Sequence, residues 1–434
     1  MQTSLLTGNH HRRTARQAGY GRFTASRRFK TSLRYVLVLL SGTLAAGCAS
    51  PGAEQSTNSP GSAMEGALEP FMEEASLEIS EVFSGERFPN VVVATDGTVL
   101  ATWGRNNIRV RRSEDGGETW GPEIPLGPGI HGGGVVVDEN TGDIQVFVEE
   151  GHPPSPLTVY RSTDHGKTWE EDDVTIHPDK NDAVPSMHMN DRGITLRHGE
   201  HAGRLLRPSR SYAGGNDRQY WEDHYTNAIY SDDGGRTWHT SDPFPAFGTG
   251  EATVAELSDG RIYYNSRRHM STDGLDPRKR YVAWSYDGGE TWENLSVSEV
   301  LPDGPQNIDY GLMAGLVRLP VEGRDILVFS NVDSPGKLEG DDSRWSERRR
   351  GTVWVSFDGG ETWPLKRLVG EGPFAYSSLA AGRPGTPSEG WIYLQYEGGP
   401  RGAHSDGQMA RFNLSWILGG EETGDGEVPD EFAR

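Results

Sequence analysis

Cysteine is nearly absent from this sequence, whose 434 residues contain a single one, Cys48. One cysteine excludes a disulfide framework and any zinc site built from cysteine pairs. The thirteen histidines show no HExxH or similar spacing, so the sequence predicts no metal centre, and we expect no cofactor.

Basic residues are also too few to balance the acidic ones: 42 Lys and Arg against 63 Asp and Glu give a formal charge of −21. Binding of a polyphosphate backbone rests on a basic surface, so nucleic acid is excluded as an obvious partner. An anionic small molecule would have to be held by a local cluster of positive charge against the unfavourable field of the whole protein.

Long apolar runs are missing, apart from one of about a dozen residues, Tyr35 to Ala46. This run is too short to span a bilayer but is typical of the apolar part of a secretory signal. Residues 1–47 hold eight basic and no acidic residues, so without them the formal charge is −29. Small residues followed by Cys48 resemble a bacterial lipobox, in which the cysteine carries the lipid. We therefore expect a lipoprotein-type signal peptide over residues 1–47, export, and a membrane anchor on Cys48. The alternatives are a short transmembrane anchor or a cleaved signal with an incidental cysteine.

The remaining chain divides by composition into three parts. Residues 48–75 begin as a Ser/Pro/Gly-rich stretch and indicate a flexible tether. Residues 421–434 are acidic and are predicted to be disordered. Residues 76–420 remain for one folded domain.

Glycine is abundant, at 57 residues, and part of it belongs to an eight-residue pattern that recurs five times. Each copy follows a short β-rich run, which indicates a hairpin turn. Asp and Ser oxygens can accept hydrogen bonds from turn amides, Gly permits positive φ, and Trp offers a large apolar face. The copies are SEDGGETW at 113–120, STDHGKTW at 162–169, SDDGGRTW at 231–238, SYDGGETW at 285–292 and SFDGGETW at 356–363.

The pattern resembles the Asp box, S-x-D-x-G-x-x-W, of the sialidase superfamily. The resemblance implies an all-β fold, a six-bladed β-propeller with five Asp boxes over residues 76–420. It marks the fold rather than the active site, because in that family the boxes lie on the face opposite the substrate. Function must be sought in other residues.

The same resemblance suggests where a carboxylate-binding cluster lies. Arg87-Phe88-Pro89 resembles the sialidase R-I-P motif, which makes Arg87 the first carboxylate-binding arginine. Glu251 heads a strand followed, across an Asp-Gly turn, by a strand that ends in N-x-R at Arg267. Glu251 would be the base beside the nucleophile and Arg267 the second arginine. Glu256 is expected to face solvent instead, and Arg268 to be a neighbour outside the cluster.

The remaining site residues follow in the last part of the chain. Counting back from the strand that enters the last box selects Arg348 as the third arginine, with Arg350 as the fallback. Tyr376, in Ala-Tyr-Ser-Ser-Leu, resembles the motif that carries the sialidase nucleophile. A neutral phenol suits that role, because a carboxylate would be repelled by the substrate's own carboxylate. Glu397 matches the residue that supports the first arginine.

The acid that protonates the leaving group is missing from its usual place. Sialidases carry an Asp in a loop between the R-I-P strand and the first box, but residues 102–110 hold no carboxylate. The sequence leaves the source of this proton open, among Asp217, Glu222, Asp223 and His224 of the insertion 211–225, and Asp191 and His131 elsewhere.

These residues together imply an exo-α-sialidase-like glycoside hydrolase, which would release sialic acid or a related keto-acid sugar from a sialylated or other acidic glycan with retention. Two alternatives stay open. One is a non-catalytic glycan-binding lipoprotein, and the other is a glycosidase or lyase for another acidic sugar.

Overall fold

The computed structural model describes residues 65–433, except 271–277, 305–310 and 335–346. The chain divides into two compact units, Met1–Ser56 and Thr57–Arg434. The first unit lies outside the described residues, as do Cys48 and most of the expected tether. Within the described part of the chain, no helix is long and apolar enough to cross a membrane.

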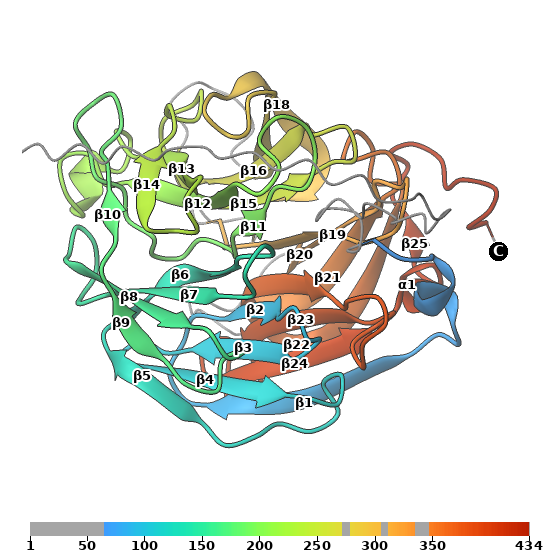
Figure 1. Cartoon of the computed structure of the whole chain (residues 1–434). Coiled ribbons are helices and arrows are strands. Elements are labelled where there is room, and N and C mark those ends of the chain that lie inside the picture. The colour runs from blue at the N-terminus through green and yellow to red at the C-terminus, as the bar shows by residue number, and fades with distance from the viewer. Residues whose placement is uncertain (1–64, 271–277, 305–310, 335–346, 434) are drawn as a thin grey trace, which may run out of the picture. The chain divides into compact units, whose positions relative to one another are not determined.

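The second unit is built almost entirely from β-strands, which confirms the all-β prediction (Figure 1). Three of its sheets have four strands and one has five. The first four-stranded sheet consists of β2 (Asn90–Val93), β3 (Val99–Trp103), β4 (Asn107–Ser113) and β5 (Ile124–Pro128). The second consists of β6 (Ile130–Val137), β7 (Ile144–Glu149), β8 (Leu157–Ser162) and β9 (Glu170–Asp172). The five-stranded sheet has β11 (Ile194–Thr195), β12 (Leu205–Ser211), β13 (Tyr225–Ser231), β14 (Thr237–Thr240) and β10 (Thr175–Ile176). The next has β15 (Thr249–Glu256), β16 (Ile262–Arg268), β17 (Lys279–Ser285) and β18 (Glu293–Pro302).

The last sheet has eight strands, and one long strand, β22 (Leu365–Ala381), belongs to both halves of it. The first part of β22 pairs with β21 and its second part with β23. The other strands are β19 (Gly315–Arg318), β20 (Leu327–Val332), β21 (Arg349–Ser356), β23 (Ile392–Gly398), β24 (Asp406–Phe412), β1 (Leu77–Ser84) and the short β25 (Glu421–Glu422). The helices are single turns, η1 (Glu69–Met72), η2 (Arg218–Tyr220) and α1 (Leu414–Ile417).

The first strands of successive sheets contact one another. β2 contacts β6, β6 contacts β11 and β12, both of these contact β15, β15 contacts β19, β19 contacts β22, and β22 contacts β2. Apolar clusters fill the space between neighbouring sheets; one joins Leu100 of β3 to Val146 of β7. The N-terminal strand β1 pairs with β24, so strands from the two ends of the unit lie in one sheet (Figure 1).

The five repeated motifs form the same hydrogen-bonded turn. In the copy at 285–292, the Ser285 hydroxyl donates to Asp287 Oδ1 at 2.7 Å, and the same carboxylate oxygen accepts from the Thr291 amide at 3.0 Å. Matching bonds occur in the other four copies. The tryptophans of the last three copies, Trp238, Trp292 and Trp363, pack on aromatic residues. Trp238 lies edge-on to Phe147 of the preceding sheet, with ring centroids 5.6 Å apart.

The acidic tail differs from its prediction. Composition predicts disorder for residues 421–434, but β25 pairs with β22, and the Asp425 carboxylate accepts from the Trp363 amide at 3.0 Å. Phe432 is buried and stacks on Phe357. One aromatic side chain and an edge strand that offers free backbone groups are enough to hold an acidic segment whose composition alone argues against order.

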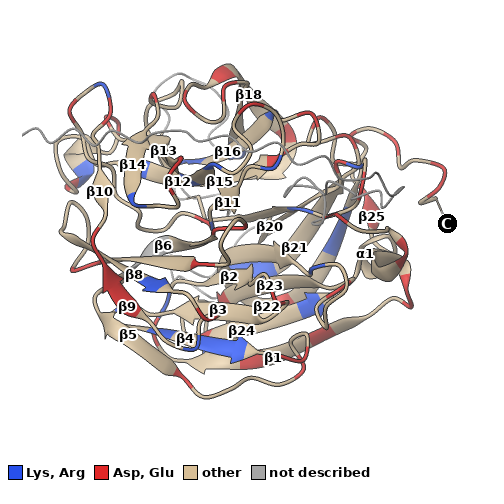
Figure 2. Cartoon of the chain, viewed as in Figure 1, with Lys and Arg blue, Asp and Glu red and all other residues tan. Residues whose placement is uncertain are grey.

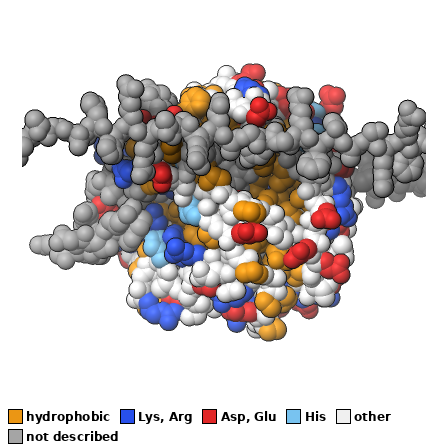
Figure 3. All heavy atoms as spheres, turned by 90° about the vertical axis from the view of Figure 1, so that its left-hand side faces the viewer, with side chains coloured by type: hydrophobic (Ala, Val, Ile, Leu, Met, Phe, Trp, Pro, Cys, Tyr) orange, Lys and Arg blue, Asp and Glu red, His pale blue; other side chains and the backbone are white. Residues whose placement is uncertain are grey.

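Charge is distributed over the described surface with both signs interspersed. Figure 2 shows acidic residues on the edge strands β1 and β9 and in many loops. On the face in Figure 3, acidic and basic side chains lie close to one another, with histidine beside some of the basic ones. The acidic excess is therefore spread over the surface, and clusters of arginine must be sought in the interior.

Candidate active site

Tyr376 and Glu251 lie next to each other, and both lie on β-bulges. Glu251 is near the start of β15, and Tyr376 is near the start of the part of β22 that pairs with β23. In β15, Gly250 and Glu251 together oppose Arg267 of β16, because the register shifts by one residue between Thr249 and Ala252. In β22, Ala375 and Tyr376 oppose Glu397 in the same way. A bulge re-aims a side chain out of the regular alternation of a strand. The two bulges place the predicted base and the predicted nucleophile next to the residues expected to assist them.

The phenol and the carboxylate are hydrogen-bonded. Tyr376 Oη donates to Glu251 Oε1 at 3.1 Å. Arg267 forms a buried ion pair with the other oxygen of Glu251, and its Nη1 lies 3.5 Å from Tyr376 Oη. These three side chains are almost completely buried. Burial, followed by the charge of Glu251, raises the pKa of Tyr376, while the nearby arginines act in the opposite direction. The phenol is therefore neutral in the resting site.

Arg87 and Arg348 lie on either side of this pair. The Arg87 Cζ lies 5.0 Å and the Arg348 Cζ 5.4 Å from the centroid of the Tyr376 ring. The Arg87 side chain is 21% exposed, in contrast to 2% for Arg267, so the cluster opens towards solvent on the Arg87 side. Burial lowers the pKa of Arg348 to about 10, with Arg87 and Arg267 adding to the effect, which still leaves it charged at neutral pH.

The structure separates Arg348 from the fallback residue Arg350. Arg350 has a positive φ of 60° and pairs with the exposed carboxylate of Glu371. The backbone carbonyl of Arg348 accepts from the Phe374 amide at 2.8 Å, two residues before Tyr376. The arrangement thus brings Arg348, and not Arg350, to the phenol.

Glu397 holds the guanidinium of Arg87 in place. Its two carboxylate oxygens accept from Arg87 Nε and Nη2, both at 3.0 Å, which is the paired geometry that fixes a guanidinium plane. The carboxylate also accepts from the Phe88 amide at 3.1 Å. Although burial acts to raise it, the charge of Arg87 and the hydrogen bond to His404 lower the pKa of Glu397 to about 2.

His404 and Phe88 belong to this site but were not identified from the sequence. His404 Nδ1 lies 2.6 Å from Glu397 and its Nε2 lies 3.2 Å from Arg348 Nη1. It therefore connects Glu397, the partner of Arg87, to Arg348. Phe88, at a positive φ of 76°, stacks on Tyr376 with ring centroids 6.2 Å apart. No motif marks His404, which lies in a loop. Phe88 lies inside the R-F-P motif, but its stacking on Tyr376 is seen only in the structure.

The acid candidates from the sequence lie elsewhere. Asp191 is fully buried, and its side chain accepts from Ser378, Thr253 and the Leu316 amide, so it joins strands below Tyr376 and cannot reach a substrate. His224 is buried, accepts from Arg210 at 2.8 Å and contacts the Gly215 carbonyl at 2.8 Å. Burial and Arg210 lower its pKa to about 4, so it is neutral at pH 7.

The acidic candidates of the insertion lie on the surface. Asp217, Glu222 and Asp223 are exposed, on the segment around η2. The side chain of His131 lies outside the described residues. Among the described residues, no group of three or more His, Cys, Asp and Glu is placed to hold a metal ion.

Comparison with known proteins gives a consistent result. Residues 104–386 match a family described as BNR repeat-like domain. The sialidase of Micromonospora viridifaciens is 32% identical over 413 residues, covering 83% of this chain and 57% of that protein. The sialidase of Bacteroides fragilis is 28% identical over 350 residues, covering 68% of this chain and 57% of that protein.

Solved structures show the same similarity. The Hadza microbial sialidase Hz136 superimposes with a TM-score of 0.57 at 26% identity, covering 77% of this chain and 66% of that one. The chain spans little more than half the length of the two curated relatives. The match over residues 104–386, in a chain whose strands follow those of sialidase structures, shows that this protein belongs to the sialidase superfamily of BNR-repeat proteins.

Proposed function

We propose that this protein is an exo-α-sialidase-like glycoside hydrolase that acts with retention through Tyr376. The observation that carries the proposal is the hydrogen bond of 3.1 Å from the neutral Tyr376 phenol to Glu251, inside a cluster of three arginines. A sialic acid bears a carboxylate on its anomeric carbon. Arg87, Arg267 and Arg348 would bind that carboxylate, and charge-assisted hydrogen bonds of this kind contribute about 1.5–3 kcal/mol each.

The chemistry follows from this placement. As the Tyr376 oxygen bonds to the anomeric carbon, its proton passes to Glu251. The glycosidic bond breaks, and its electron pair leaves with the departing oxygen, which takes up a proton from solvent. The first step gives a covalent glycosyl-tyrosine. Water then attacks the same carbon and loses one proton to solvent, Glu251 returns its proton to the tyrosine oxygen, and the sugar leaves with its configuration retained. The substrate's own carboxylate and the partly deprotonated phenol offset the positive charge that develops on the ring.

Tyr376→Phe tests this role. The variant keeps the aromatic packing on Phe88 but removes the nucleophilic oxygen, so release from a fluorogenic aryl sialoside should fall by about 10³-fold or more. A binding measurement with free sialic acid is the control, because the three arginines remain. Unchanged hydrolysis would contradict the role of Tyr376. Binding by the wild-type protein without any turnover would favour a glycan-binding protein, and turnover only of other acidic sugars would favour a different glycosidase or lyase.

A comparison of two leaving groups tests the proton source. An activated aryl group needs little protonation, whereas the alcohol of a natural sialylated glycan does. If the usual acid is absent, the natural glycan should be cleaved about 10²–10⁴-fold more slowly than the aryl sialoside. Equal rates would show that another group supplies the proton.

We further propose that the unit is a six-bladed β-propeller. The contacts of the first strands run from β2 through the successive sheets to β22, and β22 contacts β2 again, which closes the cycle. The eight-stranded sheet counts as two blades that share β22. In this arrangement β1 completes the last blade, and the ends of the first strands surround a common axis. We also propose export and lipidation at Cys48, which rest on the leader sequence alone.

A further inference from the structure

A second cavity lies at the opposite ends of the same first strands. β15 begins near Glu251 and ends at Glu256, and five residues of a strand span about 16 Å. The ends of β2, β6, β11, β15, β19 and β22 line a cavity of about 110 Å³. This is several times the room that one ordered water needs, which is on the order of 10–15 Å³.

The two ends of the strands are separated by packed side chains. Asp191 bonds to Ser378 at 2.6 Å and to Thr253 at 2.9 Å, and both partners lie between the Tyr376 end and the cavity end of their strands. The cavity is therefore a separate compartment rather than a deeper part of the candidate active site.

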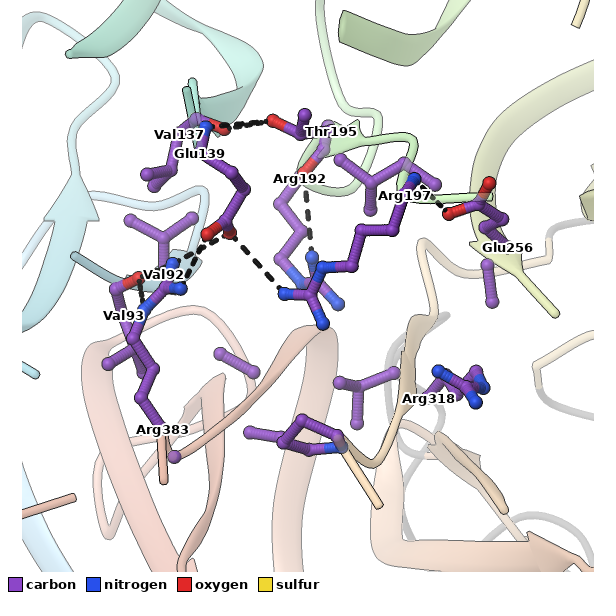
Figure 4. A pocket seen from close by; sticks show the side chains of 18 residues that line it. Val92, Val93, Val137, Glu139, Arg192, Thr195, Arg197, Glu256, Arg318 and Arg383 are labelled. Carbon is purple, nitrogen blue, oxygen red and sulfur yellow. Dashed lines mark hydrogen bonds and ion pairs between the residues drawn. The ribbon is translucent and has the colours of Figure 1, made fainter. Parts of the chain in front are cut away.

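Four arginines point into this compartment. Figure 4 shows Arg192 and Arg197 from one side, with Arg383 and Arg318 from two others. Burial, together with neighbouring positive charge, lowers the pKa of Arg192 and of Arg197. This is expected for cations that are removed from water and lie near other cations.

Two carboxylates line the cavity, and Arg318 pairs outside the lining with two others, Glu65 and Asp325. Glu139 pairs with both terminal nitrogens of Arg383, at 2.6 and 2.8 Å, and lies 3.6 Å from Arg197 Nη2. Glu256, expected from the sequence to face solvent, is buried here and accepts from two backbone amides. Burial raises its pKa to about 7, so it carries less than a full charge at neutral pH.

Arg192 is the cation without a carboxylate partner. It forms no salt bridge with any described residue, and its guanidinium donates to the carbonyl oxygens of Leu379 at 2.7 Å and Gly193 at 3.4 Å. Across the cavity, Arg318 Nη2 is buried and has no hydrogen-bond partner. A half-buried guanidinium facing another with an unused donor is the arrangement that binds planar or tetrahedral oxyanions.

We propose that this cavity binds a small oxyanion, of the carboxylate or phosphate class, between Arg192 and Arg318. The anion would connect the five-stranded sheet, which contains β11, to the eight-stranded sheet, which contains β19, at the end where Glu139 and Arg383 already join the β6 sheet to that same eight-stranded sheet. It would therefore act on the stability of the fold and not on the reaction at Tyr376. The proposal stands whether or not the protein cleaves sialosides.

Thermal unfolding of the full-length protein tests the site. Phosphate, acetate and sulfate are titrated separately at constant ionic strength set with chloride. Binding to the folded state stabilises it by mass action, so the folding equilibrium constant should rise on the order of 100-fold at 100 times the dissociation constant. Above the dissociation constant, Tm should therefore rise with the logarithm of the anion concentration. The response to phosphate and acetate distinguishes the two classes of anion.

Three variants separate the cavity from other effects. The logarithmic rise in Tm should be lost in Arg192→Gln, and kept in Arg348→Gln, which alters the other arginine cluster. It should also be kept in Arg261→Gln, which alters an arginine in the turn after β15. A rise that is equal in all variants and linear in anion concentration reflects general salt exclusion and overturns the proposal. Loss of the rise in Arg348→Gln alone would assign the anion to the Tyr376 site and would also overturn it.

A direct measurement does not depend on the stability of Arg192→Gln. Crystals of the wild-type protein soaked in selenate should show an anomalous peak between Arg192 and Arg318. A peak confined to the arginines around Tyr376, or none at all, contradicts the proposed site.

Discussion

At the scale of single residues, the candidate site depends on pairs that are distant in sequence. Tyr376 and Glu251 are 125 positions apart, and Arg87 and Glu397 are 310 apart. Tyr376 and Glu251 lie on different strands, and Arg87, in the loop before β2, pairs with Glu397 of β23, so the geometry exists only in the folded protein. Predictions at this scale concern what each pair contributes.

Arg348 and Arg350 form a natural matched pair for mutation. Arg348→Ala removes a guanidinium that faces Tyr376, and the loss of a charge-assisted contact should lower kcat/KM on a sialoside by about 10–10²-fold. Arg350→Ala removes only a pair with an exposed carboxylate and should change kcat/KM by less than about twofold. Full activity in Arg348→Ala, with a loss in Arg350→Ala, would reverse the assignment.

Glu397 should make stability depend on pH. Its pKa falls from the usual 4.5 to about 2 in the folded protein, so its contribution is present above about pH 4.5 and is lost as the pH falls towards 2. A shift of this size corresponds to stabilisation on the order of 3 kcal/mol. Urea unfolding of wild type and Glu397→Gln at pH 7, 5, 4 and 3 should show a difference that shrinks on the acid side. The exposed Glu114→Gln is the control, and a difference that stays constant from pH 7 to 3 would contradict the role of Arg87 and His404 as partners of a charged Glu397.

At the scale of elements, the repeated turns serve the sheets and not the site. Ile262 of β16 pairs with both Glu256 and Ser285, so the turn that starts at Ser285 lies at the Glu256 end of its sheet, away from Glu251. The turn residues can therefore be altered without direct contact with the candidate site.

Asp287→Ala should lower stability and leave activity unchanged. The carboxylate accepts from the Ser285 hydroxyl and from the amides of Glu290 and Thr291. Its removal leaves these donors without their partner and should cost about 1–3 kcal/mol of unfolding free energy, while kcat well below Tm stays the same. Glu299→Ala, at an exposed position of β18 in the same sheet, should cost no more than about 0.5 kcal/mol. A fall in kcat for Asp287→Ala at low temperature would show that the turn affects the site.

The sequence predicts elements better than it predicts their surroundings. The S-x-D-x-G-x-x-W repeats identify the turns because each residue type has a local hydrogen-bonding or backbone role. The positions of Tyr376, Glu251 and Arg87 follow from motifs, but the two bulges that aim Tyr376 and Glu251 depend on pairing with other strands and leave no local signal. The burial of Glu256 was missed for the same reason, because the alternation of one strand does not show what closes over its end.

At the scale of the whole molecule, composition shows the total charge but not where the charges lie. The net charge of −21 argues against nucleic acid as a partner, and this stays a prediction; both arginine clusters described above are internal. The acidic tail shows the limit of composition, because Phe432 and β25 attach it to the domain through contacts with residues far away in sequence.

Attachment to a membrane is the prediction that belongs to the entire chain. If Cys48 carries the lipid, Cys48→Ser should move the protein from the membrane fraction to the soluble fraction of expressing cells while its folded domain stays intact. Tm and sialoside hydrolysis of the released protein are the controls. Equal membrane association in wild type and Cys48→Ser would contradict lipidation and favour an uncleaved apolar anchor.

The pairing of β1 with β24 also sets an order of events during synthesis. The Ser76 amide, just before β1, donates to the Asn413 side chain 337 positions later. A ribosome adds about 5–20 residues each second, so β1 emerges roughly 15–70 s before the strand it pairs with. The last sheet therefore cannot be completed before β24 has been synthesised, and until then β1 is an unpaired edge that the cell has to keep from joining another chain.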